Sequence, residues 1–244
     1  MISERQLSEY FYSFWQDHFP LLDTMFVKRF NVEKRARLGS TMGSPALPIS
    51  MGAGVKRFDL VAELAFELAI ESYKKRIGSV PDTSGAIQRA FKRIALLQGE
   101  REMSSPAGNE RSEASLLVGN YEHWFQTIEP EGAVQFHARI KGVGVLNEME
   151  IDFCTAKTLF EVKAVNRNVQ GSDLRQVICY IVAGLGSRQY TWSDYCIFNP
   201  RLAVSYRGRI DELLGYLSGR TAPECISDFL DALLEREQPL ETTF

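Results

Sequence analysis

Two carboxylates and a lysine recur at short spacings near the middle of the chain. Asp152 is followed by Glu161, and Lys163 stands two residues further on. A hard divalent cation such as Mg²⁺ is typically held by one or two carboxylates together with waters and phosphate oxygens. Such a cation absorbs charge on a phosphoryl oxygen and activates water at neutral pH. These residue types therefore predict metal-dependent hydrolysis of phosphodiester bonds.

The sequence around Asp152 and Glu161 predicts a β-hairpin. Apolar and polar residues alternate with a period of two over two stretches, residues 148–153 and 160–164. A turn centred between them places Asp152 opposite Glu161 and Glu150 opposite Lys163, with all four side chains on one face. Facing carboxylates repel each other unless a cation lies between them. The alternative interpretation is a solvated face of the hairpin that carries a Glu150–Lys163 ion pair.

A helix is expected to follow the hairpin. Ser172 or Asp173 can cap its start. An apolar stripe of helical periodicity runs along one face, formed by Leu174, Val177, Ile178, Ile181, Val182 and Leu185. Gln176 and Tyr180 lie one turn apart on another flank, so they should not be needed to pack the helix against the sheet.

In this order, Asp152, Glu161-Val162-Lys163, Gln176 and Tyr180 resemble the PD-(D/E)XK nuclease superfamily. The Gln-x-x-x-Tyr element resembles its RecB-like branch. The match covers about a quarter of the chain, and no proline precedes Asp152, where the family signature has one.

The resemblance implies an α/β (α+β) fold with a mixed sheet and a restriction-endonuclease-like αβββαβ core. It implies that Asp152 and Glu161 hold Mg²⁺ or Mn²⁺, with the Val162 carbonyl completing the shell. Lys163 would orient or deprotonate the attacking water, aided by a pKa lowered on partial burial, or stabilise the transition state. The Gln-x-x-x-Tyr pair would position Lys163 or the DNA backbone.

Members of the superfamily often take an extra acidic residue from the helix before the first strand. That helix is expected here at about residues 110–126, which makes Glu113 the candidate for a further catalytic residue and Glu110 the second. A surface position for either glutamate is the alternative.

The chain is expected to divide into a helical N-terminal region, residues 1–105, and a nuclease-like core, residues 106–240. Residues 99–109 are polar and rich in breakers, which marks the boundary. Residues 36–57 are rich in Gly, Ser and Pro and predict a long loop, and loops of that length are usually functional or disordered.

Periodicity predicts the remaining elements. Helices are expected over residues 3–19, then to about 30, over 58–77, 82–98, 209–218 and 223–236, strands over 133–141, 194–198 and 202–206, and a frayed tail over 237–244. In the helix expected over 58–77, Glu63, Glu67 and Glu71 form a row on a different face from the leucines. We expect this glutamate row to be exposed.

Charge is distributed unevenly. The net charge is −3, yet residues 133–210 contain ten Lys or Arg against six Asp or Glu. A phosphate-binding surface needs local positive charge, so the surplus fits nucleic acid as the partner, and the resemblance implies DNA. Ordinary solvated sheet edges and loops are the alternative. Lys141, Arg167 and Arg175 are the candidate contacts. Many related cores dimerise, so a homodimer fits this interpretation.

The spacing of the cysteines limits which cofactors are expected, and the hydropathy of the chain indicates the compartment. Four widely spaced cysteines, Cys154, Cys179, Cys196 and Cys225, predict buried free thiols, and they lack the spacing of the iron–sulfur cluster found in some RecB-like nucleases. The three histidines have no zinc spacing. No signal peptide and no run of 18 apolar residues are present, which predicts a cytoplasmic protein without a membrane partner.

Two other interpretations compete with a nuclease. One is a catalytically inactive module on the same fold that binds nucleic acid or protein, which loss of Asp152, Glu161 or Lys163 would have indicated; all three are present. The other is a different hydrolase or a structural protein in which the hairpin is only an ion-paired face.

Overall fold

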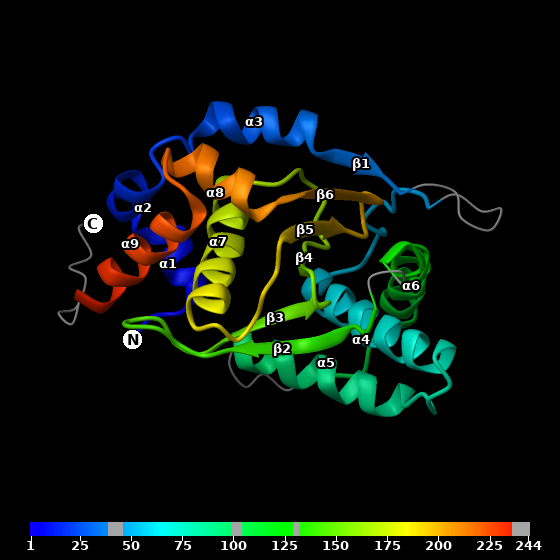
Figure 1. Ribbon diagram of the computed structural model, residues 1–244. Helices are drawn as coiled ribbons and strands as arrows, with labels where there is room; N and C mark the ends of the chain where they lie inside the picture. Colours follow the sequence, from blue (N-terminus) through cyan, green and yellow to red (C-terminus); the bar gives the residue numbers. More distant parts are fainter. Residues whose placement is uncertain (39–45, 99–103, 129–131, 236–244) are drawn as a thin grey trace.

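The computed structural model describes residues 1–38, 46–98, 104–128 and 132–235. Within them the chain has a mixed α/β fold, in which a six-stranded sheet lies between two groups of helices (Figure 1). The strand order is β1-β6-β5-β4-β3-β2. The strands are β1 (Arg35–Arg37), β2 (Gln135–Ile140), β3 (Met149–Cys154), β4 (Thr158–Val162), β5 (Asp194–Asn199) and β6 (Val204–Arg209).

Neighbouring strands β4 and β5 run parallel, whereas the other neighbours in this sheet are antiparallel. A parallel pair needs a crossover connection, and helix α7 (Gly171–Gly186) provides it. The chain thus runs α6 (Gly108–Ile128), three antiparallel strands, α7 and β5, which is the predicted order of helix, three strands, helix and strand.

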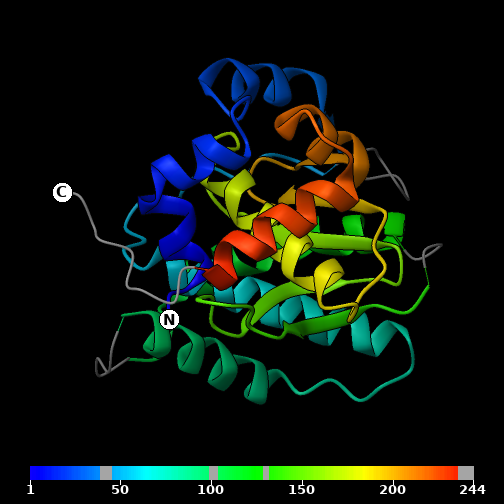
Figure 2. The same cartoon turned by 60° about the vertical axis from the view of Figure 1, so that its left-hand side comes forward.

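Each group of helices packs on one hydrophobic core. The first core joins α7 to the N-terminal and C-terminal helices, α1 (Glu4–Tyr10), α2 (Tyr12–His18), α3 (Thr24–Glu33), α8 (Ile210–Ser218) and α9 (Ala222–Glu235). The second joins the sheet to α4 (Phe58–Arg76) and α6. Helix α5 (Thr83–Gln98) lies on the outer side of α4 (Figure 2). The sheet therefore separates two independent layers of side chains.

Helix α7 buries the apolar stripe that its sequence predicts. Leu174, Val177 and Ile178 are buried in the first core. The predicted cap was wrong by two or three residues, because Gln170 precedes the helix, which begins at Gly171, and Asp173 lies inside its first turn. There the Asp173 carboxylate accepts a hydrogen bond of 2.8 Å from the backbone N–H of Gln170, which satisfies a donor at the helix start.

Aromatic rings fill the second core beside the hairpin. Trp124 of α6 stacks on Phe198 of β5 with ring centroids 3.9 Å apart, and Phe153 stacks on Phe160 across the hairpin at 4.6 Å. Such pairs contribute to stability beyond the area that they bury. They fix β3, β4 and β5 relative to α6.

The predicted register of the hairpin is confirmed where β3 and β4 pair. Phe153 lies opposite Phe160 and Cys154 opposite Leu159. The turn is closed by a hydrogen bond of 2.9 Å from the Thr155 N–H to the Thr158 carbonyl. Among the described residues the ladder between these strands is confined to those two pairs. Beyond them the strands part, and this opening lies beside Asp152.

The regular alternation of β3 breaks at Asp152. Ile151 packs in the first core, whereas Phe153 packs in the second. The neighbouring strand is irregular at the same level, since His137 has a φ of 51°, a conformation that non-glycine residues rarely adopt. Glu150 contacts Arg93 of α5, and its predicted place opposite Lys163 lies beyond the two pairs of the ladder between β3 and β4.

The N-terminal region contributes directly to the sheet. Residues 35–37, at the start of the expected loop, form the edge strand β1 and pair with β6, so the loop prediction is wrong there. Residues 39–45 of that loop, residues 99–103 of the expected boundary and the expected tail lie outside the described residues. The regions expected at 1–105 and 106–240 share both hydrophobic cores.

Two further predictions concern the cysteines and the membrane. All four cysteines are buried free thiols, as their spacing indicated. In the described part of the chain no helix combines the length and the apolar character needed to cross a membrane.

Candidate active site

The candidate site lies where β3 and β4 part. Asp152 Oδ2 accepts a hydrogen bond of 2.6 Å from the backbone N–H of Val162, so its side chain bridges the opening between the strands. Glu161, the residue before Val162, is buried. The charges of Asp152 and Glu161 are close enough to raise the pKa of Asp152. The structure thus brings the two predicted carboxylates together.

Lys163 connects this opening to helix α7. Its Nζ lies 2.7 Å from Glu161 Oε1 and donates a hydrogen bond of 2.7 Å to Gln176 Oε1. Asp173 Oδ1 lies 3.9 Å away on the first turn of α7. The position of Lys163 is fixed at its own backbone as well, because its N–H donates to the Phe198 carbonyl at 2.8 Å.

Gln176 and Tyr180 extend this hydrogen-bonded chain along α7. Gln176 Nε2 donates to the Tyr180 hydroxyl at 2.7 Å, and the spacing of one helical turn makes this contact possible. Burial raises the pKa of Tyr180 well above its usual range, so the hydroxyl stays protonated. Tyr180 is itself part of the first core, contrary to the prediction that it is not needed for packing.

The N-terminal helix α1 supplies a residue that the sequence did not single out. The Glu4 carboxylate interacts with the Tyr180 side chain and with the charges of Glu161 and Lys163. Burial raises the pKa of Glu4, and the charge of Glu161 acts in the same direction. Helix α1 is docked on α7 and begins with a capping box at Ser3. A hydrogen-bonded chain therefore runs from Lys163 through Gln176 to Tyr180, and Glu4 interacts with its end.

The site carries an excess of carboxylates. Burial raises the pKa of Asp152 well above its usual range, and repulsion from Glu161 and Glu63 adds to this effect. The Val162 N–H and Lys163 act in the opposite direction without cancelling it. The pKa of Glu63 on α4 is raised as well, chiefly by burial. Negative charge at this place is therefore poorly stabilised by the protein alone.

The electrostatics of Lys163 differ from the prediction. Burial disfavours the ammonium, but the carboxylates of Glu161, Asp173 and Asp152 outweigh it and raise the pKa of Lys163. The expectation of a pKa lowered by burial was wrong, because it took no account of these partners. In the metal-free protein Lys163 is therefore a cation, and in that state it is suited to orienting water or stabilising negative charge.

Glu113 lies in another ion pair, so the structure does not bring it to this site. Its Oε1 lies 2.6 Å from Arg201 Nη2, and its Oε2 accepts a hydrogen bond of 2.7 Å from the Gly52 N–H. Arg201 has no exposed side-chain surface. Glu110, the second candidate, pairs with Arg57 at 2.5 Å. Both glutamates of α6 tie loop segments to the fold.

The three candidate nucleic-acid contacts, Lys141, Arg167 and Arg175, differ in exposure and in the partners that they contact. Lys141 is exposed just after β2. Arg167 forms a double contact with Asp173 at 2.6 and 3.1 Å, and this pairing contributes most to raising its pKa. Arg175 donates to the Ser8 carbonyl at 2.5 Å, and burial lowers its pKa. Of these three, Lys141 is exposed, whereas both arginines are partly buried and engaged in contacts within the protein.

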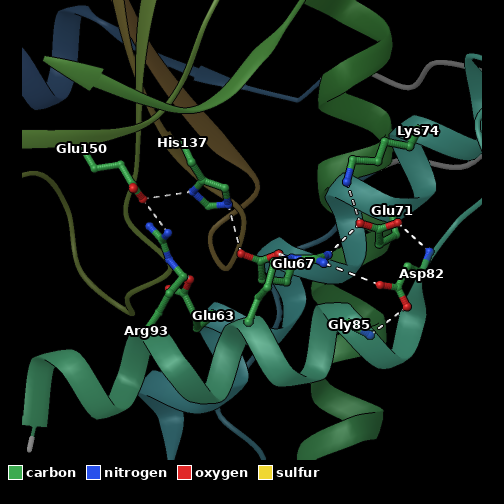
Figure 3. Close-up of polar contacts among 10 residues, drawn as sticks. Glu63, Glu67, Glu71, Lys74, Asp82, Gly85, Arg93, His137 and Glu150 are labelled. Atoms are coloured by element: carbon green, nitrogen blue, oxygen red, sulfur yellow. Dashed lines mark hydrogen bonds and ion pairs between the residues drawn. The ribbon is translucent and has the colours of Figure 1, made fainter.

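In the glutamate row of α4, Glu67 and Glu71 are buried and Glu63 is half-buried, contrary to the prediction that the row is exposed. Glu67 is 1% exposed and Glu71 is 3% exposed. Arg89 of α5 contacts both of them at 2.6 Å, and His137 Nε2 lies 3.0 Å from Glu67 Oε1 (Figure 3). A matching signal was present in the sequence, because Arg89 and Arg93 have the same spacing of four residues as the glutamates that they meet.

Metal binding at this site would depend on the two carboxylates of Asp152 and Glu161. In the described residues no group of three or more His, Cys, Asp and Glu side chains is arranged to hold a metal ion. A hard cation such as Mg²⁺ needs only one or two carboxylates from the protein. Asp152 and Glu161 provide two, and their mutual repulsion is what a cation would relieve. These residues therefore fit Mg²⁺ or Mn²⁺.

Comparison of the chain with protein-family models, with curated proteins and with solved structures gives no match.

Proposed function

We propose that this protein is a metal-dependent nuclease that hydrolyses phosphodiester bonds, with DNA as its substrate. The observation that carries the proposal is the meeting of Asp152 and Glu161 with Lys163, whose ammonium is held between Glu161 and the Gln176 amide at 2.7 Å each. The order of helix, three strands, helix and strand supports a restriction-endonuclease-like core. The Gln176–Tyr180 contact supports the RecB-like branch.

In the proposed reaction Asp152 and Glu161 hold the cation, with the Val162 carbonyl as a further ligand. When bound, Mg²⁺ or Mn²⁺ supplies Lewis acidity to the phosphoryl group and lowers the pKa of water. Lys163, kept protonated by its carboxylate neighbours, orients the attacking water and offsets the charge that develops on the phosphoryl oxygens. Gln176 holds the Lys163 ammonium in position, and Tyr180 holds the Gln176 amide.

The experiment is a cleavage assay on linear and circular, single-stranded and double-stranded DNA and on RNA, with Mg²⁺, with Mn²⁺ and with EDTA. We expect cleavage of DNA that requires the metal and that EDTA abolishes. Nucleic-acid binding without cleavage in every condition would favour the inactive module. Cleavage that persists in EDTA would contradict a metal-dependent mechanism.

Removing the Gln176 amide should reduce cleavage while leaving the fold intact. Gln176→Ala takes one hydrogen-bond partner from Lys163, and Tyr180→Phe takes the partner of Gln176. We expect each to lower single-turnover cleavage about tenfold, which corresponds to about 1.4 kcal/mol of transition-state stabilisation. Tyr190→Phe, which removes a hydroxyl bonded to the Arg139 carbonyl, is the matched control. Full activity in Gln176→Ala would remove the main support for the RecB-like assignment.

A further inference from the structure

Helix α5 presents two arginines to the acidic side of α4. Arg89 and Arg93 lie one turn apart and meet Glu63, Glu67 and Glu71, which lie on successive turns (Figure 3). Arg89 contacts Glu67 and Glu71. Lys74 contacts Glu71, and Asp82 contacts Arg89. Arg93 contacts Glu63, the glutamate of the row whose charge acts on Asp152.

Arg93 joins α5 to the residues around Asp152. Its Nε contacts Glu63, and its Nη1 lies 2.5 Å from Glu150 Oε1. Glu150 precedes Asp152 by two residues on β3, and Glu63 is one of the carboxylates whose charge acts on Asp152. The guanidinium therefore lies between two carboxylates that flank the proposed metal ligand.

The charge on Arg93 is held firmly. Burial works against the guanidinium, but Glu63, Glu150 and Asp152 outweigh this effect and raise the pKa of Arg93. The side chain is nevertheless 28% exposed, so it has a route to solvent. It is a permanent cation at the edge of a site with excess negative charge.

Helix α5 packs on the second core through Ala90 and the partly buried Ile87. Among its described side chains, the buried apolar residues are Ala86, Ala90 and Ile94, two of them without a side chain beyond Cβ. Small side chains bury little apolar area. The contacts of Arg89 and Arg93 are accordingly a large part of what holds α5 to α4.

We infer that Arg93 is an internal counterion of the carboxylates around Asp152, and that a divalent cation at Asp152 and Glu161 competes with it. The inference rests on the proposed function. A guanidinium and a divalent cation repel each other. Arg93 contacts Glu63 and Glu150, and its charge also acts on Asp152, so a cation held by Asp152 would meet the repulsion of this guanidinium. Metal binding would therefore loosen the hold of Arg93, and α5 with it, on α4 and β3.

Metal binding measured by calorimetry tests this directly. Arg93→Gln removes the competing charge, so Mn²⁺ should bind about fivefold more tightly or better at moderate salt. The metal-free variant should also melt at a lower temperature, because Glu63 and Glu150 both lose their contact with Arg93 and Glu150 retains only His137, 3.3 Å away, among its described ion-pair contacts. Arg93→Lys, which keeps the charge, should bind Mn²⁺ like the wild type. Arg89→Gln is the matched control, with a lower melting temperature and an unchanged affinity for Mn²⁺.

The outcomes separate the two claims. Equal or weaker Mn²⁺ binding in Arg93→Gln overturns the inference alone. Mn²⁺ binding by the wild type that Asp152→Asn retains, or no binding at all, overturns the proposed function and the inference together. If Arg93→Gln does not fold, the test is instead an NMR measurement of the ¹⁵N signal of the Arg93 guanidinium in the wild type. That signal should shift on addition of Mg²⁺, and an unchanged signal at saturation overturns the inference.

Discussion

Asp152→Asn should abolish metal-dependent cleavage and make the metal-free protein more stable. The amide cannot contribute a charged ligand to the cation, so we expect cleavage to fall by about a thousandfold or more, about 4 kcal/mol of transition-state stabilisation. The amide oxygen can still accept the hydrogen bond from the Val162 N–H. The variant therefore loses the repulsion with Glu161 and Glu63 without losing this contact.

The gain in stability should depend on pH. The pKa of Asp152 is raised in the folded protein. The protonated carboxyl therefore contributes to the free energy of unfolding at low pH, and this contribution is lost as pH rises through the folded-state pKa. The amide of the Asp152→Asn variant does not ionise. The difference in melting temperature between this variant and wild type, measured in EDTA from about pH 4 to about pH 8, should grow with pH. A difference that shrinks over this range would contradict the assigned repulsion.

Glu113→Ala should have the largest effect on stability without serving the chemistry. The substitution leaves the fully buried Arg201 without its carboxylate partner and the Gly52 N–H without its acceptor. Breaking a buried ion pair from one side costs about 3–5 kcal/mol of unfolding free energy. Urea denaturation measures this loss.

Glu122→Ala is the control for this variant, because Glu122 is an exposed residue on the same helix, where substitutions change stability by about 0.5 kcal/mol or less. The cleavage rate per folded molecule of Glu113→Ala should equal that of wild type under conditions where both are folded. A stable Glu113→Ala protein without cleavage would restore the family-based role of Glu113.

The hairpin could be predicted from sequence because its information is local. A period of two and a central turn fix which residues pair, and the pairs Phe153–Phe160 and Cys154–Leu159 follow from them. The stripe on α7 is predictable for the same reason. The edge strand over residues 35–37 was missed because all three of its residues are exposed, so backbone pairing with β6, rather than an apolar pattern, defines it.

The charges of the site could not be predicted from local pattern. Glu4 comes from a helix far away in the sequence, and its proximity to Tyr180 depends on how α1 docks on α7. The glutamate row of α4 has the spacing of a solvated face. Arg89 of α5, together with His137 and Lys74, supplies the partners that offset the burial of Glu67 and Glu71. The direction of the Lys163 pKa likewise depends on three carboxylates brought together by the fold.

A crystal of the wild-type protein soaked in Mn²⁺ tests the central claim most directly. The Mn²⁺ anomalous signal locates the cation independently of any assay of activity. We expect a peak between the carboxylates of Asp152 and Glu161, and no peak there in Asp152→Asn treated in the same way. A wild-type crystal without a peak between these two side chains, or with its only peak elsewhere, would contradict a metal-dependent site at this opening of the sheet.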